Sequence, residues 1–362
     1  MRLRALVLAA GLGTRLRPLT DDLPKPLLPV HGQPLLGLTL RRLAAAGCEA
    51  AAINLHHGAG HIRSAFGSEH AGLPLTWSEE PRLLGTLGAL GPLAGFFADA
   101  DLALVVNGDS LCRWPLAELL RRHLATGALA TLLLAARADP AEFGGGVAVD
   151  RAGKLLYLRP PGAPGATGGL GGQAADGVSP PPGRGPRGMP RTWRRVFAGA
   201  HVLSRRVLQR IAGSATPAPA DFVRDLYEPL LAEQPGCLDT LTTGRRWHDI
   251  GTPRRYLEAT LDWAGARGLW ISPAAAVAPS AAVRRSSLEA GSRVAAGAIV
   301  EDSVLLPGAT VGAGCEVRGS ILGAGVELPA GDHVTSQIVV AGGSRSNLEA
   351  RKSRTLPDLR PR

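Results

Sequence analysis

The feature that most limits what this chain can fold into is a 17-residue repeat near its C-terminus. Three aliphatic positions and one glycine recur with this spacing: Ile271, Leu288, Leu305 and Leu322; Val277, Val294, Val311 and Leu328; Val283, Val300, Val317 and Val334; and Gly291, Gly308 and Gly325. A single short repeat cannot bury its own apolar side chains, so stacked repeats must share one core. Three apolar corners per repeat predict a triangular β-solenoid.

Upstream of this repeat, short apolar runs alternate with helical patterns. Four apolar runs predict strands, at 3–9, 50–55, 73–78 and 102–107, and the leucine spacing from Pro34 to Ala46 predicts a helix. This alternation is typical of a doubly wound, mostly parallel sheet. A chain of 362 residues favours two domains. We expect an α/β domain over 1–266, a β-helix over 267–340 and a basic flexible tail over 341–362.

The net charge of +10 is concentrated in two segments. Residues 151–197 carry eight Arg or Lys against Asp176, and residues 351–362 carry five against Asp358, so the remainder is about neutral. Charge in a flexible segment and a tail is usually solvated, and no nucleic-acid motif accompanies it. We therefore expect no nucleic-acid partner.

Other features of composition bear on partners and compartment. The segment 160–190 holds 18 Gly or Pro in 31 residues and is expected to be a disordered insertion, with an active-site lid as the alternative. The four cysteines form no CxxC pair, which argues against a zinc site or a disulfide framework. The sequence has no 18-residue apolar span and no signal peptide, so we expect a cytoplasmic protein without membrane association.

The chemistry begins in the stretch Leu8 to Pro29, LAAGLGTRLRPLTDDLPKPLLP. Glycines let a backbone approach a polyphosphate and turn its N–H groups inward, while Arg15 and Lys25 supply positive charge. The pattern matches neither common phosphate loop, since Leu16 stands where a dinucleotide fingerprint has its third glycine and Gly-Lys-Ser/Thr is absent. The stretch therefore predicts a phosphate cradle of another kind.

This stretch resembles the opening motif of the sugar-1-phosphate nucleotidyltransferases. The resemblance implies that Arg15 meets the phosphates of a nucleoside triphosphate and that Lys25 contacts phosphate at the reacting centre. It also implies a nucleotide-binding set that continues into the second glycine loop, EEPRLLGTLGAL at 79–90: Leu8, Ala10, Gly11, Gly13, Thr14, Gly85, Thr86 and Gly88. That second loop looks most like the guanylyl and the heptose- or mannose-type members.

Two aspartates are predicted to hold a metal. The run 102–107 ends in Asn107-Gly108-Asp109, and a carboxylate at the carboxyl end of a parallel strand is well sited for a hard cation beside phosphates. The resemblance assigns Asp109 and Asp249, the latter in WHDIGTP, to Mg²⁺. His56, His57 and His61 offer a competing metal reading, but nothing nearby completes a site, and we expect them to be structural.

Sugar recognition is the weakest part of the match. The resemblance implies sugar contacts from Asn107, Gly146, Arg159 and Gly199. Where relatives have Glu-Lys-Pro, however, this chain reads Leu158-Arg159-Pro160. Arg159 can still bind phosphate, but no carboxylate replaces the glutamate that holds sugar hydroxyls.

The C-terminal repeat resembles the left-handed β-helix of hexapeptide repeats that many sugar nucleotidyltransferases carry. Such a β-helix implies assembly, here a homo-oligomer, more than chemistry. An acetyltransferase role would require more coils and a catalytic histidine, and His333 is the only histidine in this part of the chain.

These features predict a Mg²⁺-dependent transfer of a nucleoside monophosphate from a nucleoside triphosphate to a sugar 1-phosphate, with pyrophosphate released. The second glycine loop and the β-helix favour GTP and mannose 1-phosphate. Glucose-1-phosphate thymidylyl- or uridylyltransferases and heptose-1-phosphate guanylyltransferases remain alternatives. An alternative of another class is a non-catalytic regulatory subunit that senses nucleotide sugars.

Overall fold

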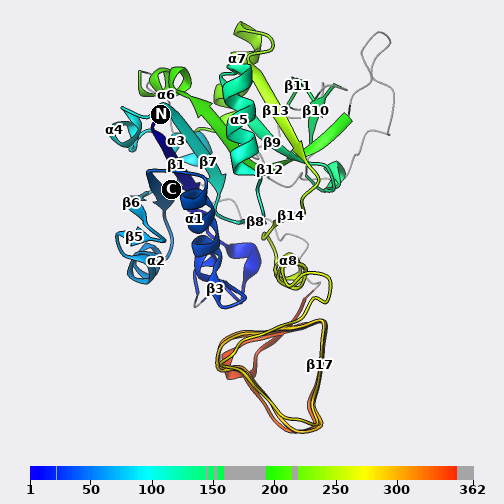
Figure 1. Cartoon of the computed structure of the whole chain (residues 1–362). Helices are drawn as coiled ribbons and strands as arrows, with labels where there is room; N and C mark the ends of the chain where they lie inside the picture. The colour runs from blue at the N-terminus through cyan, green and yellow to red at the C-terminus, as the bar shows by residue number, and fades with distance from the viewer. Residues whose placement is uncertain (22, 144–145, 151–152, 159–192, 214–218, 349–362) are drawn as a thin grey trace, which may run out of the picture. The chain divides into compact units, whose positions relative to one another are not determined.

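A ten-stranded mixed sheet forms the centre of the N-terminal part of the chain in the computed structural model (Figure 1). The structure describes residues 1–21, 23–143, 146–150, 153–158, 193–213 and 219–348. Its contacts divide the chain into two units, which we call the sheet unit, Met1–Leu12 with Leu36–Asp249, and the solenoid unit, Gly13–Leu35 with Ile250–Arg362. The segment 160–190, Arg159 and the residues from 349 onward lie outside the described residues.

In the sheet unit, the strands run in the order β11-β10-β12-β7-β1-β4-β6-β5, with β9 on β12 and β13 on β9. Their bounds are β1 Leu3–Leu8, β4 Ala50–Leu55, β5 Glu69–His70, β6 Leu73–Glu79, β7 Leu102–Asn107, β9 Ala130–Ala135, β10 Val147–Val149, β11 Leu155–Tyr157, β12 Trp193–Ser204 and β13 Leu238–Thr243. The block β7-β1-β4-β6 is parallel, as is β9-β13, and the long strand β12 joins the two blocks in antiparallel pairing. The predicted doubly wound sheet is thus confirmed, with a mixed second half.

Helices flank this sheet, and the central strands are buried almost residue by residue, as in sheets that are covered on both faces. Bounds of the helices are α1 Leu35–Ala45, α2 Ala59–Phe66, α3 Gly85–Gly88, α4 Ala94–Phe97, α5 Leu116–Thr126, α6 Arg205–Ala212 and α7 Glu228–Glu233, with a 3-10 turn η3 at Pro140–Phe143 and a π-helical turn η4 at Val223–Tyr227. None of the helices in the described ranges combines the length and apolar character needed to cross a membrane. All four cysteines are buried and unpaired in disulfides, as predicted.

The solenoid unit contains the predicted triangular coils, drawn yellow to red in Figure 1. One side is β15 Trp270–Ile271, β18 Ser287–Leu288, β21 Val304–Leu305, β24 Ile321–Leu322, β27 Gln337–Val339 and β28 Arg345–Asn347; the second is β16 Ala276–Val277, β19 Arg293–Val294, β22 Thr310–Val311 and β25 Glu327–Leu328; the third is β17 Ala282–Arg284, β20 Ile299–Glu301, β23 Glu316–Arg318 and β26 His333–Thr335. In each parallel pair of these strands, a residue lies opposite the residue 17 positions later, as Ile271 does with Leu288 and Leu305 with Leu322. The repeat period therefore equals one coil.

Other elements also belong to the solenoid unit. They are η1 Thr14–Leu16, η2 Lys25–Leu27, β2 Pro29–Val30, β3 Gln33–Pro34, α8 Pro253–Trp263 and η5 Ala341–Gly343. Thr252 caps α8 by accepting from the Arg255 N–H, and Pro253 occupies the first turn, where its missing N–H does no harm. The expected tail from 341 begins with ordered backbone, because β28 pairs antiparallel with β27.

Candidate active site

The predicted metal aspartate Asp109 sits where β7 leaves the sheet. Asn107 pairs with Leu8 of the parallel strand β1, so both lie at the carboxyl ends of central strands. The next residue, Gly108, donates its N–H to the Leu8 carbonyl at 2.8 Å. A Cβ at position 108 would stand 2.9 Å from that carbonyl oxygen, so only glycine allows the turn that presents Asp109.

The second aspartate is brought to the first by a short antiparallel pair. Strand β8, Ser110–Cys112, follows Asp109 and pairs with β14, Trp247–Asp249, so that Asp249 lies opposite Ser110. The Trp247 indole also donates to the Ser110 hydroxyl at 3.1 Å. Asp249 is buried and Asp109 is partly exposed. The structure therefore pairs Asp249 with the residue that follows Asp109, in a group that we call the aspartate corner: residues 107–110 with Asp249.

Strand β12 passes close to this corner at the predicted sugar residue Gly199. Gly199 has φ +71°, and a Cβ there would stand 2.6 Å from the Ser110 hydroxyl oxygen and 3.3 Å from the Asn107 Cβ. Close packing against the corner thus requires a glycine at 199. The second predicted sugar glycine, Gly146, is also required by close packing, since a Cβ there would stand 2.5 Å from the Arg195 carbonyl oxygen.

Sequence reasoning missed a buried polar chain that fixes the end of β1. The Asn54 side chain accepts from the Ala9 N–H at 2.8 Å and donates to Glu80 at 2.8 Å. The other carboxylate oxygen of Glu80 accepts from the Leu84 N–H at 2.9 Å. These bonds link the start of the first glycine loop to the second. The signal was the second carboxylate of Ser-Glu-Glu-Pro, immediately before that second loop.

The glycines of the second glycine loop lie in the short helix α3. Gly85 has φ +79° and lies against Ala220, whose carbonyl accepts from the N–H groups of Leu87 and Gly88. The Thr86 hydroxyl donates to Asp221 at 3.1 Å. The Thr86 hydroxyl and the Gly88 N–H, two donors from residues predicted to contact a nucleotide, are therefore used in hydrogen bonds within the protein.

In the solenoid unit, the phosphate-cradle segment folds on itself. Gly13 adopts φ +64° and precedes η1, where Thr14 and Arg15 are exposed. The Thr20 hydroxyl donates to the Gly13 carbonyl at 2.9 Å. A Cβ on Gly13 would stand 3.6 Å from both Lys25 and Thr20. Gly13, η1 and Lys25 thus form one packed cluster. Gly11, in the sheet unit, is exposed and has no atom within 4 Å of its Cβ position, and Ala10 beside it is buried.

The aspartate corner is chemically suited to Mg²⁺. Two carboxylates are a sufficient protein contribution, because Mg²⁺ usually keeps several waters and takes its remaining ligands from substrate phosphates. Within the described ranges, no group of three or more His, Cys, Asp or Glu could hold a metal. His56 donates its Nδ1 proton to the Glu80 carbonyl at 2.6 Å, which supports the structural reading of that histidine.

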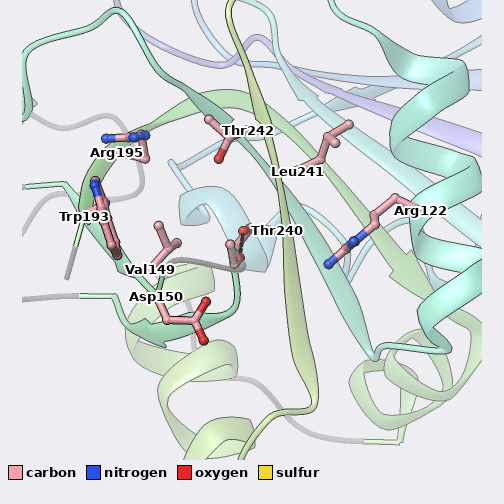
Figure 2. A pocket seen from close by; sticks show the side chains of 9 residues that line it. Arg122, Val149, Asp150, Trp193, Arg195, Thr240, Leu241 and Thr242 are labelled. Carbon is pink, nitrogen blue, oxygen red and sulfur yellow. Dashed lines mark hydrogen bonds between the residues drawn. The ribbon is translucent and has the colours of Figure 1, made fainter. Parts of the chain in front are cut away.

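A cavity of about 480 Å³ lies elsewhere in the sheet unit (Figure 2). It is lined by Arg122, Val149, Asp150, Gly153, Trp193, Arg195, Thr240, Leu241 and Thr242. Figure 2 shows Arg122 on the other side of β13 from Trp193 and Arg195. The Arg122 guanidinium is already paired in a bidentate manner with Asp239, at 2.5 and 2.9 Å. Among the predicted active-site residues that the structure describes, none lines this cavity, so we do not take it as the candidate site.

Comparison with known proteins shows the family of this chain. The family described as "Nucleotidyl transferase" matches residues 4–265, and the family "GlmU-like, C-terminal hexapeptide" matches residues 266–338. A mannose-1-phosphate guanylyltransferase of Mycobacterium tuberculosis is 31% identical over 75% of this chain and 66% of its own length. A mannose-1-phosphate guanyltransferase of Schizosaccharomyces pombe is 27% identical over 71% of this chain and 63% of its own length. The chain thus spans somewhat under two thirds of these relatives.

Solved structures share the fold. HddC from Yersinia pseudotuberculosis superposes with a TM-score of 0.54 over 72% of this chain and 99% of its own, at 20% identity. The same protein complexed with GMP-PN gives a TM-score of 0.53 over the same shares, at 21% identity. Since the nucleotidyl transferase model covers residues 4–265, well over half of the chain, this chain belongs to the nucleotidyl transferase family, the family to which its first motif points, with a hexapeptide β-helix at its C-terminus.

Proposed function

We propose that this chain transfers a nucleoside monophosphate from a nucleoside triphosphate to a sugar 1-phosphate and releases pyrophosphate. The observation that supports this proposal is the pairing of β8 with β14, in which Asp249 lies opposite Ser110, the residue after Asp109, close to the carboxyl end of a central strand. Membership of the nucleotidyl transferase family supports the same reaction.

The proposed mechanism relies on positioning and charge. A sugar-phosphate oxygen attacks the α-phosphorus in line with the leaving pyrophosphate, so no covalent enzyme intermediate is needed. Arg15 neutralises the leaving pyrophosphate, and Lys25 stabilises the charge that develops at the reacting phosphate. Asp109 and Asp249 would hold Mg²⁺, which would supply positive charge to phosphate oxygens. Gly11, Gly13 and Thr14 offer backbone donors to the triphosphate.

For the substrates, we propose GTP and mannose 1-phosphate. The relatives named above are mannose-1-phosphate guanylyl- or guanyltransferases, and the loop around Gly85 resembles the guanylyl type. Sugar contacts from Asn107, Gly146, Arg159 and Gly199 belong to this proposal, as do a cytoplasmic location and a homo-oligomer formed through the β-helix.

A regulatory role is the second candidate, and one observation favours it. Leu158 stands where similar enzymes have a sugar-binding glutamate, and its side chain is 6% exposed, packed into the core of the sheet unit. That position therefore offers no polar group to a sugar. A chain that binds nucleotide sugars without converting them would tolerate this change.

The test is pyrophosphate release by the full chain, with the common nucleoside triphosphates crossed against mannose, glucose, N-acetylhexosamine and heptose 1-phosphates. We expect one pair, GTP with mannose 1-phosphate, to give turnover that stops on chelation of Mg²⁺ and returns when Mg²⁺ is added. Turnover with another pair would change the substrate and keep the reaction. Binding of nucleotide sugars with no turnover by any pair would favour the regulatory role.

A further inference from the structure

A carboxylate of the β-helix accepts two hydrogen bonds from the backbone at the end of the phosphate-cradle segment. Strands β2 and β3 form a hairpin whose two turn residues, His31 and Gly32, both have positive φ, 54° and 73°. Such a turn leaves its N–H groups pointing outward from the hairpin. One oxygen of Glu289 accepts from the His31 N–H at 3.0 Å, and the other accepts from the Gly32 N–H at 2.7 Å.

Glu289 departs from the repeat in which it stands. The residues 17 positions before and after it, Ser272 and Leu306, and Gly323 one coil further on, donate their N–H groups to the next coil in the same way that Glu289 does. None of these three is charged. Glu289 is only 1% exposed, and burial raises the pKa of its carboxyl above the ordinary value. Burying a carboxylate costs desolvation free energy, and the next coil has leucine at this position. The presence of Glu289 therefore indicates a role outside the coil.

The rest of the turn is held by neighbours in the same unit. The His31 ring stacks on Trp270, with centroids 5.0 Å apart and planes 10° from parallel. Its Nε2 donates to the Thr260 carbonyl of α8 at 3.0 Å. The Tyr256 hydroxyl, also on α8, donates to the Pro29 carbonyl. A Cβ on Gly32 would come within 3.4 Å of Trp270. The hairpin is thus fixed by the first coils and by the helix that leads into them.

This fixed hairpin is continuous with the predicted catalytic lysine. The Leu28 N–H donates to the Lys25 carbonyl at 3.1 Å, and the Leu35 N–H donates to the Leu28 carbonyl at 3.0 Å across the hairpin. Lys25 in turn packs on Gly13, which precedes η1 and Arg15. A displacement of the turn would therefore move the backbone that carries Lys25.

We propose that Glu289 is a positioning residue for the phosphate-cradle segment: through the His31–Gly32 turn it fixes the backbone that presents Lys25 to phosphate. The first coils of the β-helix thereby act in catalysis as well as in assembly. The consequence for turnover rests on the proposed nucleotidyl transfer, whereas the consequence for backbone order does not.

Two substitutions test the proposal against one control. Glu289→Gln removes one of the two acceptors, and Glu289→Leu restores the residue type of Leu306, so the coil itself should still fold. The control, Glu301→Gln, makes the same chemical change in a carboxylate that pairs with Arg318 on β23. The first measurement is amide hydrogen exchange of the full chain. In both Glu289 variants we expect exchange over residues 25–32 to be at least ~10-fold faster, since a charged acceptor of those amides is lost, with β21 and β24 still protected.

The second measurement is function. We expect kcat/KM to fall about 10- to 100-fold in both variants, mainly through kcat, because small misplacements of a positioned group are that costly. The Glu301→Gln variant should behave as the wild type in both measurements. Unchanged exchange over 25–32, or faster exchange with wild-type kcat/KM, would overturn the proposal. If the wild type turns over no substrate pair, the proposed function fails separately from this inference. Amide exchange and the affinity for GTP then test the inference: an unchanged affinity in the Glu289 variants would overturn it, and a ~10-fold loss would support it.

Discussion

The aspartate corner and the phosphate-cradle segment carry the predicted catalytic groups, but they are held in different ways. The corner is fixed by strand register and by close backbone packing at Gly108 and Gly199, within the sheet unit. The segment has little regular structure of its own and is fixed by side chains distant in sequence, with Glu289 lying 258 residues from His31. The corner involves many backbone contacts at once, whereas the turn of the segment relies on the two oxygens of one carboxylate. The fold of the corner should therefore tolerate changes that preserve packing, whereas the backbone position of the segment should depend on single polar groups.

The largest effect should come from the carboxylates of the corner. Asp109→Asn and Asp249→Asn keep size and packing but remove the negative charge that we propose for Mg²⁺. We expect each to lower kcat about 10³-fold, which corresponds to about 4 kcal/mol of transition-state stabilisation, with little change in the melting temperature. Steady-state pyrophosphate release measures the first quantity and calorimetry the second.

The two variants also test whether the corner acts as one site. If both aspartates hold the same ion, the double variant should be scarcely slower than either single one, because groups that act as a unit are not additive. Effects that multiply in the double variant would show that the two carboxylates act separately, and near-normal turnover in Asp109→Asn would remove that residue from the site.

The next effect should come from steric packing of the corner. In Gly199→Ala, the added Cβ would meet the Ser110 hydroxyl oxygen at 2.6 Å, so Ser110 and its bond from Trp247 must move. We expect a loss of about 2–4 kcal/mol in the free energy of unfolding and at least ~10-fold in kcat. The matched control is Gly127→Ala, which has φ +61° but no atom within 4 Å of its Cβ position. It should lose only the ~1 kcal/mol of the left-handed conformation. Equal losses in the two variants would refute the packing argument.

A smaller effect is expected at the buried link between the two glycine loops. Glu80→Gln leaves a single acceptor for two donors, the Asn54 amide and the Leu84 N–H. Since Glu80 is buried, we expect a loss of about 1.5–3 kcal/mol in the free energy of unfolding, measured by urea titration. Glu79→Gln is the control, because Glu79 is exposed and pairs only with Arg63 at the surface among the interactions described for it. It should change stability by less than about 1 kcal/mol, and a similar loss in both variants would argue against the link.

Sequence reasoning reached the parts of the molecule that follow from periodicity. The 17-residue repeat predicted the three sheets of the solenoid and their register, and the apolar runs at 50–55 and 102–107 became β4 and β7 with those bounds. The pairing that joins Asp109 to Asp249 was only implied by the resemblance, because it connects residues 140 positions apart in two very short strands.

What the sequence could not supply were contacts that depend on the assembled backbone. The antiparallel strand β12 between two parallel blocks leaves no periodic signal, since it is as apolar as its neighbours. Glu80 and Glu289 look like ordinary surface carboxylates until the fold buries them. The only sequence signal for either residue is its position: Glu80 directly precedes the second glycine loop, and Glu289 is a charged residue in the repeat where the other coils have uncharged ones.

The smallest effect should be the response to acid, which is opposite in sign in the two units. In the sheet unit, burial lowers the pKa of His201 to about 3, and its Nδ1 is hydrogen-bonded to the Tyr227 hydroxyl. Below pH 6.5 the unfolded chain binds a proton that the folded unit does not. The free energy of unfolding therefore decreases as the pH is lowered, by about 1.4 kcal/mol at pH 5.5.

In the solenoid unit, the raised pKa of Glu289 means that the folded state binds its proton more readily, so acid relieves the buried charge instead of adding to its cost. Calorimetry at pH 7.5 and 5.5 measures both effects as differences between each variant and the wild type. In His201→Gln, the acid-induced drop in melting temperature should shrink by about 4 °C. In Glu289→Gln, the loss of stability relative to the wild type should be smaller at pH 7.5 than in acid, because acid stabilises the wild-type carboxyl and not the amide. Each variant removes only the titrating group whose pKa burial has moved. If lowering the pH changed the stability of both variants, relative to the wild type, with the same sign, the two units would not differ in this way.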